Sequence, residues 1–78
     1  MLYPAQFEDC VGVESFKDSI VVTFRDVPEA ITQGYTFGDA VCMAEDALKA
    51  AMEFYDEAGK PRPQPSEPQH DDVLIELR

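Results

Sequence analysis

Hydrophobic residues recur every three or four positions along residues 36–58, which is the spacing of one face of an α-helix. Thr36 is suited to cap the N-terminus of this helix, with Asp39 three residues later. Gly59 and Pro61 mark its end. The stretch therefore predicts one long amphipathic helix over residues 36–58. Its apolar stripe consists of Phe37, Val41, Ala44, Leu48, Ala51, Tyr55 and Ala58.

The opposite side of this helix is acidic and is expected to face water. It carries Asp39, Glu45, Asp46, Lys49, Glu53, Asp56 and Glu57. A flank formed by Met43, Ala47, Ala50 and Phe54 widens the apolar side beyond what one small sheet covers. Two interpretations of the flank are open: it packs beneath the Pro-rich segment that follows the helix, or it forms a subunit contact.

Alternating apolar and polar residues predict four strands, at residues 2–8, 20–25, 30–33 and 73–77. The second is β-branched or aromatic at nearly every position and is expected at or near the centre of a sheet. Pro4 lacks an N–H, so its backbone should point away from a neighbouring strand. Gly34 is expected to supply the turn into the helix. Residues 9–18 have no clean period and are predicted to continue a hairpin that turns near residues 17–19.

The predicted order is three strands, the helix, an extended Pro-rich connector and a fourth strand. This order predicts a single α+β domain over residues 1–78, a two-layer β-β-β-α-β arrangement with a mainly antiparallel sheet and the helix on one face. The return through the helix is expected to place the last strand parallel to a neighbour.

Charge narrows the choice of partner. The 78 residues include 16 acidic and six basic side chains, a formal net charge of −10. Such a chain repels phosphate backbones and anionic membranes and attracts basic proteins. We expect no direct contact with nucleic acid or membrane by this chain alone. Because short chains bury a modest share of their surface, we also expect a homo-oligomer or a partner. The sequence has no secretion signal and no apolar run that approaches a membrane span, which favours the cytoplasm.

Few residues suggest metal or redox chemistry. Cys10 and Cys42 match no metal-ligand spacing, although a disulfide between them remains an alternative. His70 is the only histidine and has no second ligand or nucleophile near it in the sequence. We therefore predict no metal ion and no cofactor.

Four segments together resemble the HicB family of antitoxins, in the part that forms a partial RNase H-like domain. They are YPAQFE at residues 3–8, VVTFRDVPEAITQG at 21–34, the helix with its spacing of Ala40, Ala44, Ala47, Leu48 and Ala51, and GKPRPQPS at 59–66. The resemblance implies an antitoxin that binds and neutralises a small basic HicA-like toxin, a ribonuclease that cleaves mRNA. The family also has a C-terminal DNA-binding domain, which we do not expect within these 78 residues.

We expect the partner to contact exposed acidic positions at strand ends. The predicted partner-binding residues are Glu8, Asp9, Asp26, Val27, Pro28 and Glu29. We predict no enzymatic activity. One alternative is a homo-oligomeric orphan regulator or scaffold. Another is a metal-dependent RNase H-like nuclease built on Asp26 with Glu45 or Asp46. The helical angles place Glu45 and Asp46 away from the sheet, so they should not meet Asp26.

Overall fold

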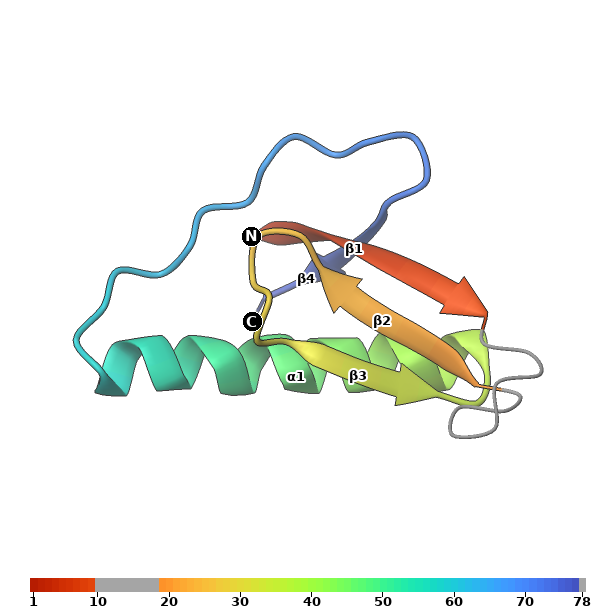
Figure 1. The fold of residues 1–78 in the computed structure, drawn as a ribbon, viewed down its shortest axis with the longest axis horizontal. Coiled ribbons are helices and arrows are strands. Elements are labelled where there is room, and N and C mark those ends of the chain that lie inside the picture. The colour runs from red at the N-terminus through yellow and green to blue at the C-terminus, as the bar shows by residue number, and fades with distance from the viewer. Residues whose placement is uncertain (10–18, 78) are drawn as a thin grey trace.

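A computed structural model describes residues 1–9 and 19–77 as four strands and one helix. The chain runs through β1 (Leu2–Asp9), β2 (Ile20–Phe24), β3 (Ile31–Gly34), α1 (Phe37–Glu57) and β4 (Val73–Glu76). The sheet order is β3-β2-β1-β4, every neighbouring pair is antiparallel, and α1 lies across one face (Figure 1). The predicted two-layer α+β fold with β-β-β-α-β order is confirmed. The expected turn near residues 17–19 and the alternative Cys10–Cys42 disulfide involve residues outside the described part.

The predicted strand and helix positions are correct to within one or two residues. Thr36 caps α1, since its Oγ1 accepts a hydrogen bond from the N–H of Asp39 at 3.0 Å. Pro4 lies one residue outside the β1–β2 pairing, which begins at Ala5, as a residue without an N–H should. Gly34 does not form the turn into α1; it is the last residue of β3.

The direction of β4 differs from the prediction. β4 pairs antiparallel with β1, from Leu2 opposite Glu76 to Ala5 opposite Val73. The reason is the length of the connector, which we define as residues 58–72. α1 runs in the direction opposite to β1 and β3, and the connector then returns along the sheet before β4 begins (Figure 1). β4 therefore runs in the direction opposite to β1. A short connection would have given the parallel strand.

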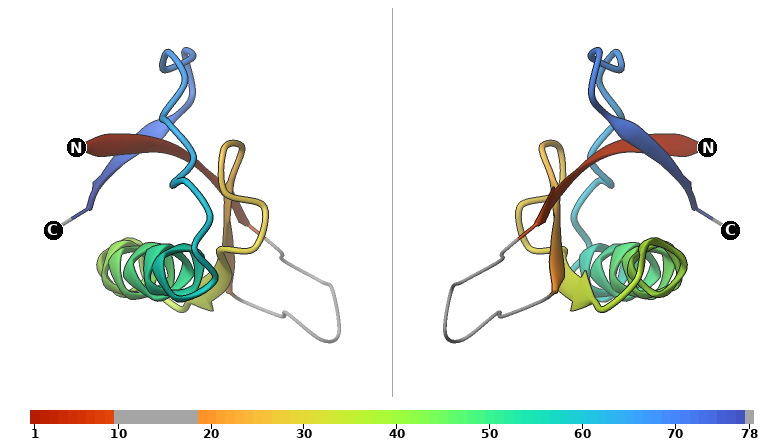
Figure 2. Two further views of the ribbon diagram at one scale, coloured as in Figure 1. Left: turned by 90° about the vertical axis from the view of Figure 1, so that its left-hand side faces the viewer. Right: turned by 90° about the vertical axis from the view of Figure 1, so that its right-hand side faces the viewer.

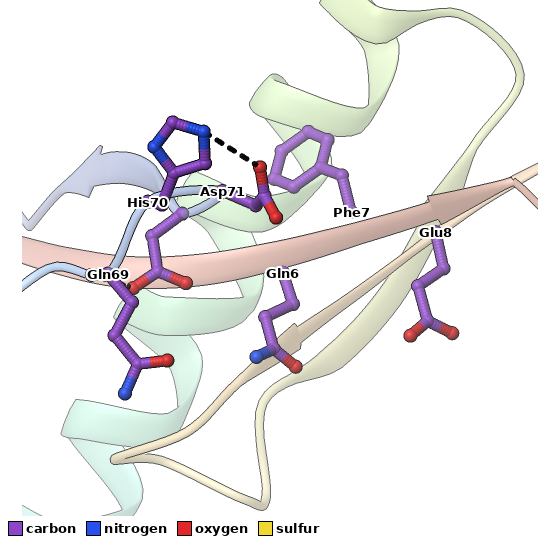
Figure 3. A pocket seen from close by; sticks show the side chains of 7 residues that line it. Gln6, Phe7, Glu8, Gln69, His70 and Asp71 are labelled. Atoms are coloured by element: carbon purple, nitrogen blue, oxygen red, sulfur yellow. Dashed lines mark hydrogen bonds and ion pairs between the residues drawn. The ribbon is translucent and has the colours of Figure 1, made fainter.

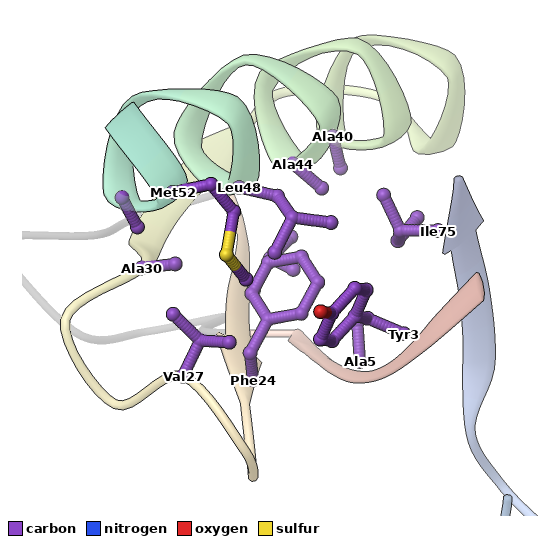
Figure 4. Close-up of a cluster of buried hydrophobic side chains, with 12 residues drawn as sticks. Tyr3, Ala5, Phe24, Val27, Ala30, Ala40, Ala44, Leu48, Met52 and Ile75 are labelled. Carbon is purple, nitrogen blue, oxygen red and sulfur yellow. The ribbon is translucent and has the colours of Figure 1, made fainter. Parts of the chain in front are cut away.

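The core lies between α1 and the face of the sheet that carries the apolar side chains (Figure 4). Tyr3 and Ala5 from β1 and Val22 and Phe24 from β2 are buried there, as the alternation predicted. The buried line on α1 differs in part from the predicted stripe. It consists of Ala40, Ala44, Leu48, Ala51 and Met52.

Two ends of the predicted stripe do not reach the core. Phe37 and Ala58 are exposed, whereas Ala40 and Met52 take buried positions that the stripe did not include. At the start of α1 the reason is the close approach of β3, which brings the backbone of Gly34 against that of Ala40. Only a small side chain fits there. The ring of Phe37 instead lies beside that of Phe7, with centroids 5.3 Å apart.

The connector does not cover the flank of α1. It leaves the end of the helix, passes round the end of the sheet and reaches the other side of β1 (Figure 2). On the way the Tyr3 hydroxyl donates a hydrogen bond to the carbonyl of Pro63 at 2.7 Å. Met43 and Phe54 stay exposed. The interpretation that these two pack beneath the Pro-rich segment is therefore wrong. No helix in the described residues is long and apolar enough to cross a membrane.

Candidate partner-binding surfaces

The loop between β2 and β3 holds four of the residues predicted to meet a partner. Two backbone hydrogen bonds shape it, from Val27 N–H to Phe24 carbonyl at 3.3 Å and from Ala30 N–H to Val27 carbonyl at 2.9 Å. These turns direct Val27 into the core, where it is fully buried, and leave Pro28 and Glu29 exposed. Val27 was expected in an exposed loop; that expectation is wrong, because its side chain is buried in the core beside Phe24 and Met52 (Figure 4).

Asp26 fastens the connector to the sheet. Its Oδ2 accepts hydrogen bonds from the backbone N–H of Ser66 at 2.8 Å and from the Ser66 hydroxyl at 2.9 Å. A carboxylate that accepts two hydrogen bonds helps hold the backbone of a segment that has no regular structure of its own. Asp26 thus has a structural role. The described residues also contain no cluster of three or more His, Cys, Asp or Glu side chains able to hold a metal ion.

Glu29 is exposed but not isolated. The Tyr55 hydroxyl of α1 donates a hydrogen bond to its Oε2. This hydrogen bond lowers the pKa of Glu29 because it stabilises the charged carboxylate. It raises the pKa of Tyr55 because the hydroxyl must keep its proton to donate the bond. Glu29 therefore presents a fixed negative charge at the loop surface.

The guanidinium of Arg25 joins the end of β2 to the end of the connector. Its Nη2 donates to Asp72 Oδ2 at 2.8 Å, and its Nη1 lies 3.4 Å from Asp72 Oδ1, a fork-to-fork pair. Arg25 also donates to the Ser66 hydroxyl at 3.2 Å and to the Glu67 carbonyl at 3.3 Å. Asp72 accepts a further hydrogen bond from the N–H of Gln69 at 2.7 Å. The hydrogen bond from Arg25, helped by that from Gln69, lowers the pKa of Asp72.

A pH prediction follows from this pair. Because the pKa of Asp72 is lower in the folded chain than its ordinary value of 3.8, its stabilising effect is complete above that value and is lost as the pH falls through the folded pKa. We expect Asp72→Asn to lower the free energy of unfolding at pH 7 and to reduce its decline between about pH 5 and pH 2. Urea denaturation followed by circular dichroism at each pH measures both effects.

Asp71→Asn is the matched control for Asp72→Asn. The Asp71 side chain is 98% exposed, against 3% for Asp72, and its described contact is with the equally exposed His70 at 3.9 Å. We expect it to leave the stability at pH 7 unchanged. Equal losses in the two variants would show that net charge, not the Arg25 pair, is responsible.

Glu8 lies at the other end of the sheet from the β2–β3 loop. β1 runs away from that loop, and Glu8 pairs with Val21 whereas Ala5 pairs with Phe24 (Figure 1). The two groups of predicted residues therefore do not form one site. Asp9 ends β1 beside Glu8 in sequence.

Glu8 borders a hollow beside the second half of β1. β4 pairs with β1 only from Leu2 to Ala5, so within the described residues no strand lies against the β4 side of β1 beyond that point. The hollow there is rich in acceptor oxygens (Figure 3). It is lined by Gln6, Phe7, Glu8, Gln69, His70, Asp71 and Asp72.

The sequence analysis did not predict this hollow, since it depends on how far β4 extends along β1. It also missed a second acidic hollow between α1 and β4, lined by Glu45, Asp46, Lys49 and Glu76. A signal for Glu76 was present: the alternation that turns Val73 and Ile75 inward turns Glu76 outward. Both hollows offer carboxylates to a basic partner.

Comparisons with known proteins agree on one family. Residues 3–78 match the family described as the HicB-like antitoxin of bacterial toxin-antitoxin systems. Antitoxin HicB of Escherichia coli strain K12 is 44% identical over 57 residues, covering 73% of this chain and 41% of that protein. Antitoxin HicB 2 of Photorhabdus laumondii is 43% identical over 67 residues, covering 85% and 43%. The chain thus matches about two fifths of the length of these relatives.

The fold has a counterpart among solved structures. The crystal structure of the N-terminal domain of Burkholderia pseudomallei antitoxin HicB superposes with a TM-score of 0.72 over 100% of this chain and 99% of that one. The sequence identity is 19%, so this comparison bears on the fold alone.

Proposed function

Because the chain belongs to the family of HicB-like antitoxins of bacterial toxin-antitoxin systems, we propose that it binds and neutralises a small basic HicA-like toxin that cleaves mRNA. The observation that carries the proposal is the family match over residues 3–78. We further propose that the pair acts in the cytoplasm, that this chain forms a single domain over residues 1–78, and that its role is binding and not catalysis.

The charge of the chain supports this proposal. A net charge of −10 attracts a toxin that must itself be basic to bind RNA, and opposite charges speed association. Exposed carboxylates can then occupy the positions on the toxin where RNA phosphates would bind. Neutralisation in this picture is competition for the same basic surface.

Among the predicted toxin-binding residues whose side chains the structure describes, Glu8, Pro28 and Glu29 are exposed. Asp26 and Val27 instead shape the loop that presents them, through the Ser66 hydrogen bonds and the core. We propose that the toxin contacts the Glu29 loop or the hollow beside Glu8. The two sites lie at opposite ends of the sheet, so separate charge reversals can tell them apart.

We expect a neighbouring gene to encode a small basic protein, and the test measures the binding of that protein to the purified chain. We expect Glu29→Lys or Glu8→Lys to weaken binding at least tenfold, which corresponds to about 1.4 kcal/mol. We also expect affinity to fall as salt rises from 50 to 500 mM, because the attraction between the charges is screened. Isothermal titration calorimetry measures the affinity, and rescue of toxin-arrested growth by co-expression measures neutralisation.

Glu53→Lys is the control, because it makes the same charge change on the exposed face of α1, away from both proposed sites. If Glu53→Lys weakens binding as much as the other two variants, the toxin sits on the helix and the proposed sites are wrong. Absence of binding at 50 mM salt would contradict the antitoxin proposal itself.

A further inference from the structure

The second half of β1 is an open edge of the sheet. β2 pairs with β1 from Ala5 to Asp9, whereas β4 pairs with the other side of β1 only from Leu2 to Ala5. Beyond Ala5, no strand in the described residues pairs with this second side. An unpaired strand edge can take up one further strand. We call β1 residues 6–9, on their β4 side, the open edge.

The backbone of the open edge directs hydrogen-bonding groups outward at Phe7. In an antiparallel sheet the residues of a strand alternate between facing one neighbour and facing the other. The Leu77 N–H donates to the Met1 carbonyl at 2.9 Å, so the odd-numbered residues of β1 face β4. Pro4 agrees with this assignment, because it faces the β2 side at a point where the β1–β2 ladder has ended. The N–H and C=O of Phe7 therefore point outward, where β4 no longer reaches.

One face of the open edge is apolar. Tyr3 and Ala5 are buried against α1, and the alternation of β1 turns Phe7 to the same face. The Phe7 ring lies beside that of Phe37, with centroids 5.3 Å apart, and Phe37 is 57% exposed. The β4 pairing stops before it reaches these rings. An apolar side chain on an added strand would lie beside them and remove apolar surface from water.

The other face of the open edge is acidic. Glu8 follows Phe7 in β1 and points to the opposite face (Figure 3). It lines the hollow together with two further carboxylates, those of Asp71 and Asp72. Arg25 pairs with Asp72, so one guanidinium stands against three carboxylates. The hollow therefore attracts a Lys or Arg side chain.

We propose that the open edge takes up an extended segment of the toxin as an added strand, antiparallel to β1 and in line with β4. The choice of occupant rests on the proposed function, which supplies a basic partner. The residue opposite Phe7 exchanges N–H···O hydrogen bonds with it in both directions and places an apolar side chain beside its ring. Directly opposite residues share a face, so the residue opposite Glu8 places a Lys or Arg side chain at the hollow. The segment recognised is therefore an apolar residue between two basic ones.

Amide hydrogen exchange tests the backbone pairing. It is followed by NMR on the isotope-labelled chain, alone and with the small basic protein expected from a neighbouring gene. In the chain alone we expect fast exchange of the Phe7 N–H and slow exchange of the Glu8 N–H, which faces β2. The toxin should slow exchange at Phe7 at least tenfold. The N–H of Leu74 is the control, because it faces the outer side of β4 and should keep its fast exchange.

Two exposed rings on α1 test the apolar half of the recognition. Phe37 is 57% exposed and lies beside Phe7, whereas Phe54 is 59% exposed near the other end of the helix. We expect Phe37→Ala to weaken toxin binding at least tenfold in calorimetry and Phe54→Ala to leave it unchanged. Circular dichroism should show both variants folded. Equal effects of the two changes would contradict strand addition beside Phe7.

The outcomes separate this proposal from the antitoxin proposal. A complex that forms while Phe7 keeps its exchange rate overturns strand addition and leaves the antitoxin role intact. Protection of Leu74 in place of Phe7 would assign the toxin to β4 and also overturns it. So does slow exchange of Phe7 in the chain alone, because the edge would then already be covered. Absence of any complex at 50 mM salt overturns the antitoxin role, and strand addition with it.

Discussion

Replacing Leu48 with alanine is expected to lower the free energy of unfolding by about 2–5 kcal/mol, the range for removing a fully buried leucine side chain. Leu48 is 0% exposed and lies at the middle of the contact between α1 and the sheet (Figure 4). Its neighbours cannot close the space, since Ala44 and Ala51 on the same face are small and the sheet is held by its own ladders. A loss of this size is a large part of the stability of a small domain, typically about 5–15 kcal/mol. Urea denaturation followed by circular dichroism at 222 nm measures it.

Lys49→Ala is the control for Leu48→Ala. Lys49 is the next residue along α1 and is exposed, so its removal changes helix content little and the core not at all. We expect a change within about 0.5 kcal/mol. A Leu48→Ala variant as stable as Lys49→Ala would mean that α1 does not pack on the sheet through this residue, which would contradict the fold described above.

The sequence could predict the features that depend on the spacing of nearby residues along the chain. Alternation identified the buried face of β2, where Val22 and Phe24 turn inward, and the 3.6-residue period located α1. Thr36 identified the start of the helix, because an N-cap is a contact between residues three positions apart. These features need no knowledge of distant parts of the chain.

Features set by distant contacts could not be predicted. The direction of β4 depends on where the connector ends, and that depends on the Asp26–Ser66 and Arg25–Asp72 contacts, between residues 40 and 47 positions apart. Val27 looked like part of an exposed loop because Pro28 follows it; only the two turns on either side direct it inward. The same limit applied to the candidate sites. Local pattern identified acidic positions, but which carboxylates bind other parts of the chain is decided by the assembled fold.

Gly34→Ala is expected to lower the free energy of unfolding by about 3 kcal/mol, the upper end of the usual cost of overpacking. A Cβ on Gly34 would lie 2.5 Å from the backbone nitrogen of Ala40, 2.7 Å from its Cα and 2.8 Å from the carbonyl carbon of Asp39. All three atoms belong to the first turns of α1, so no side chain can rotate aside. Either β3 or the start of the helix must move, and either movement opens the core around Ala40 and Ala44.

Gly38→Ala is the matched control and should have the opposite sign. Gly38 lies in the first turn of α1, and the atom nearest to an added Cβ is Thr36 Oγ1 at 4.0 Å. Alanine loses less backbone entropy than glycine on folding, so the variant should gain roughly 0.5 kcal/mol. The two variants each add one methyl group, at positions four residues apart. Comparing their stabilities therefore distinguishes the close strand-to-helix contact at Gly34 from the open helical position at Gly38. If urea denaturation gives Gly34→Ala and Gly38→Ala equal stability, the close approach of β3 to the first turns of α1 is wrong.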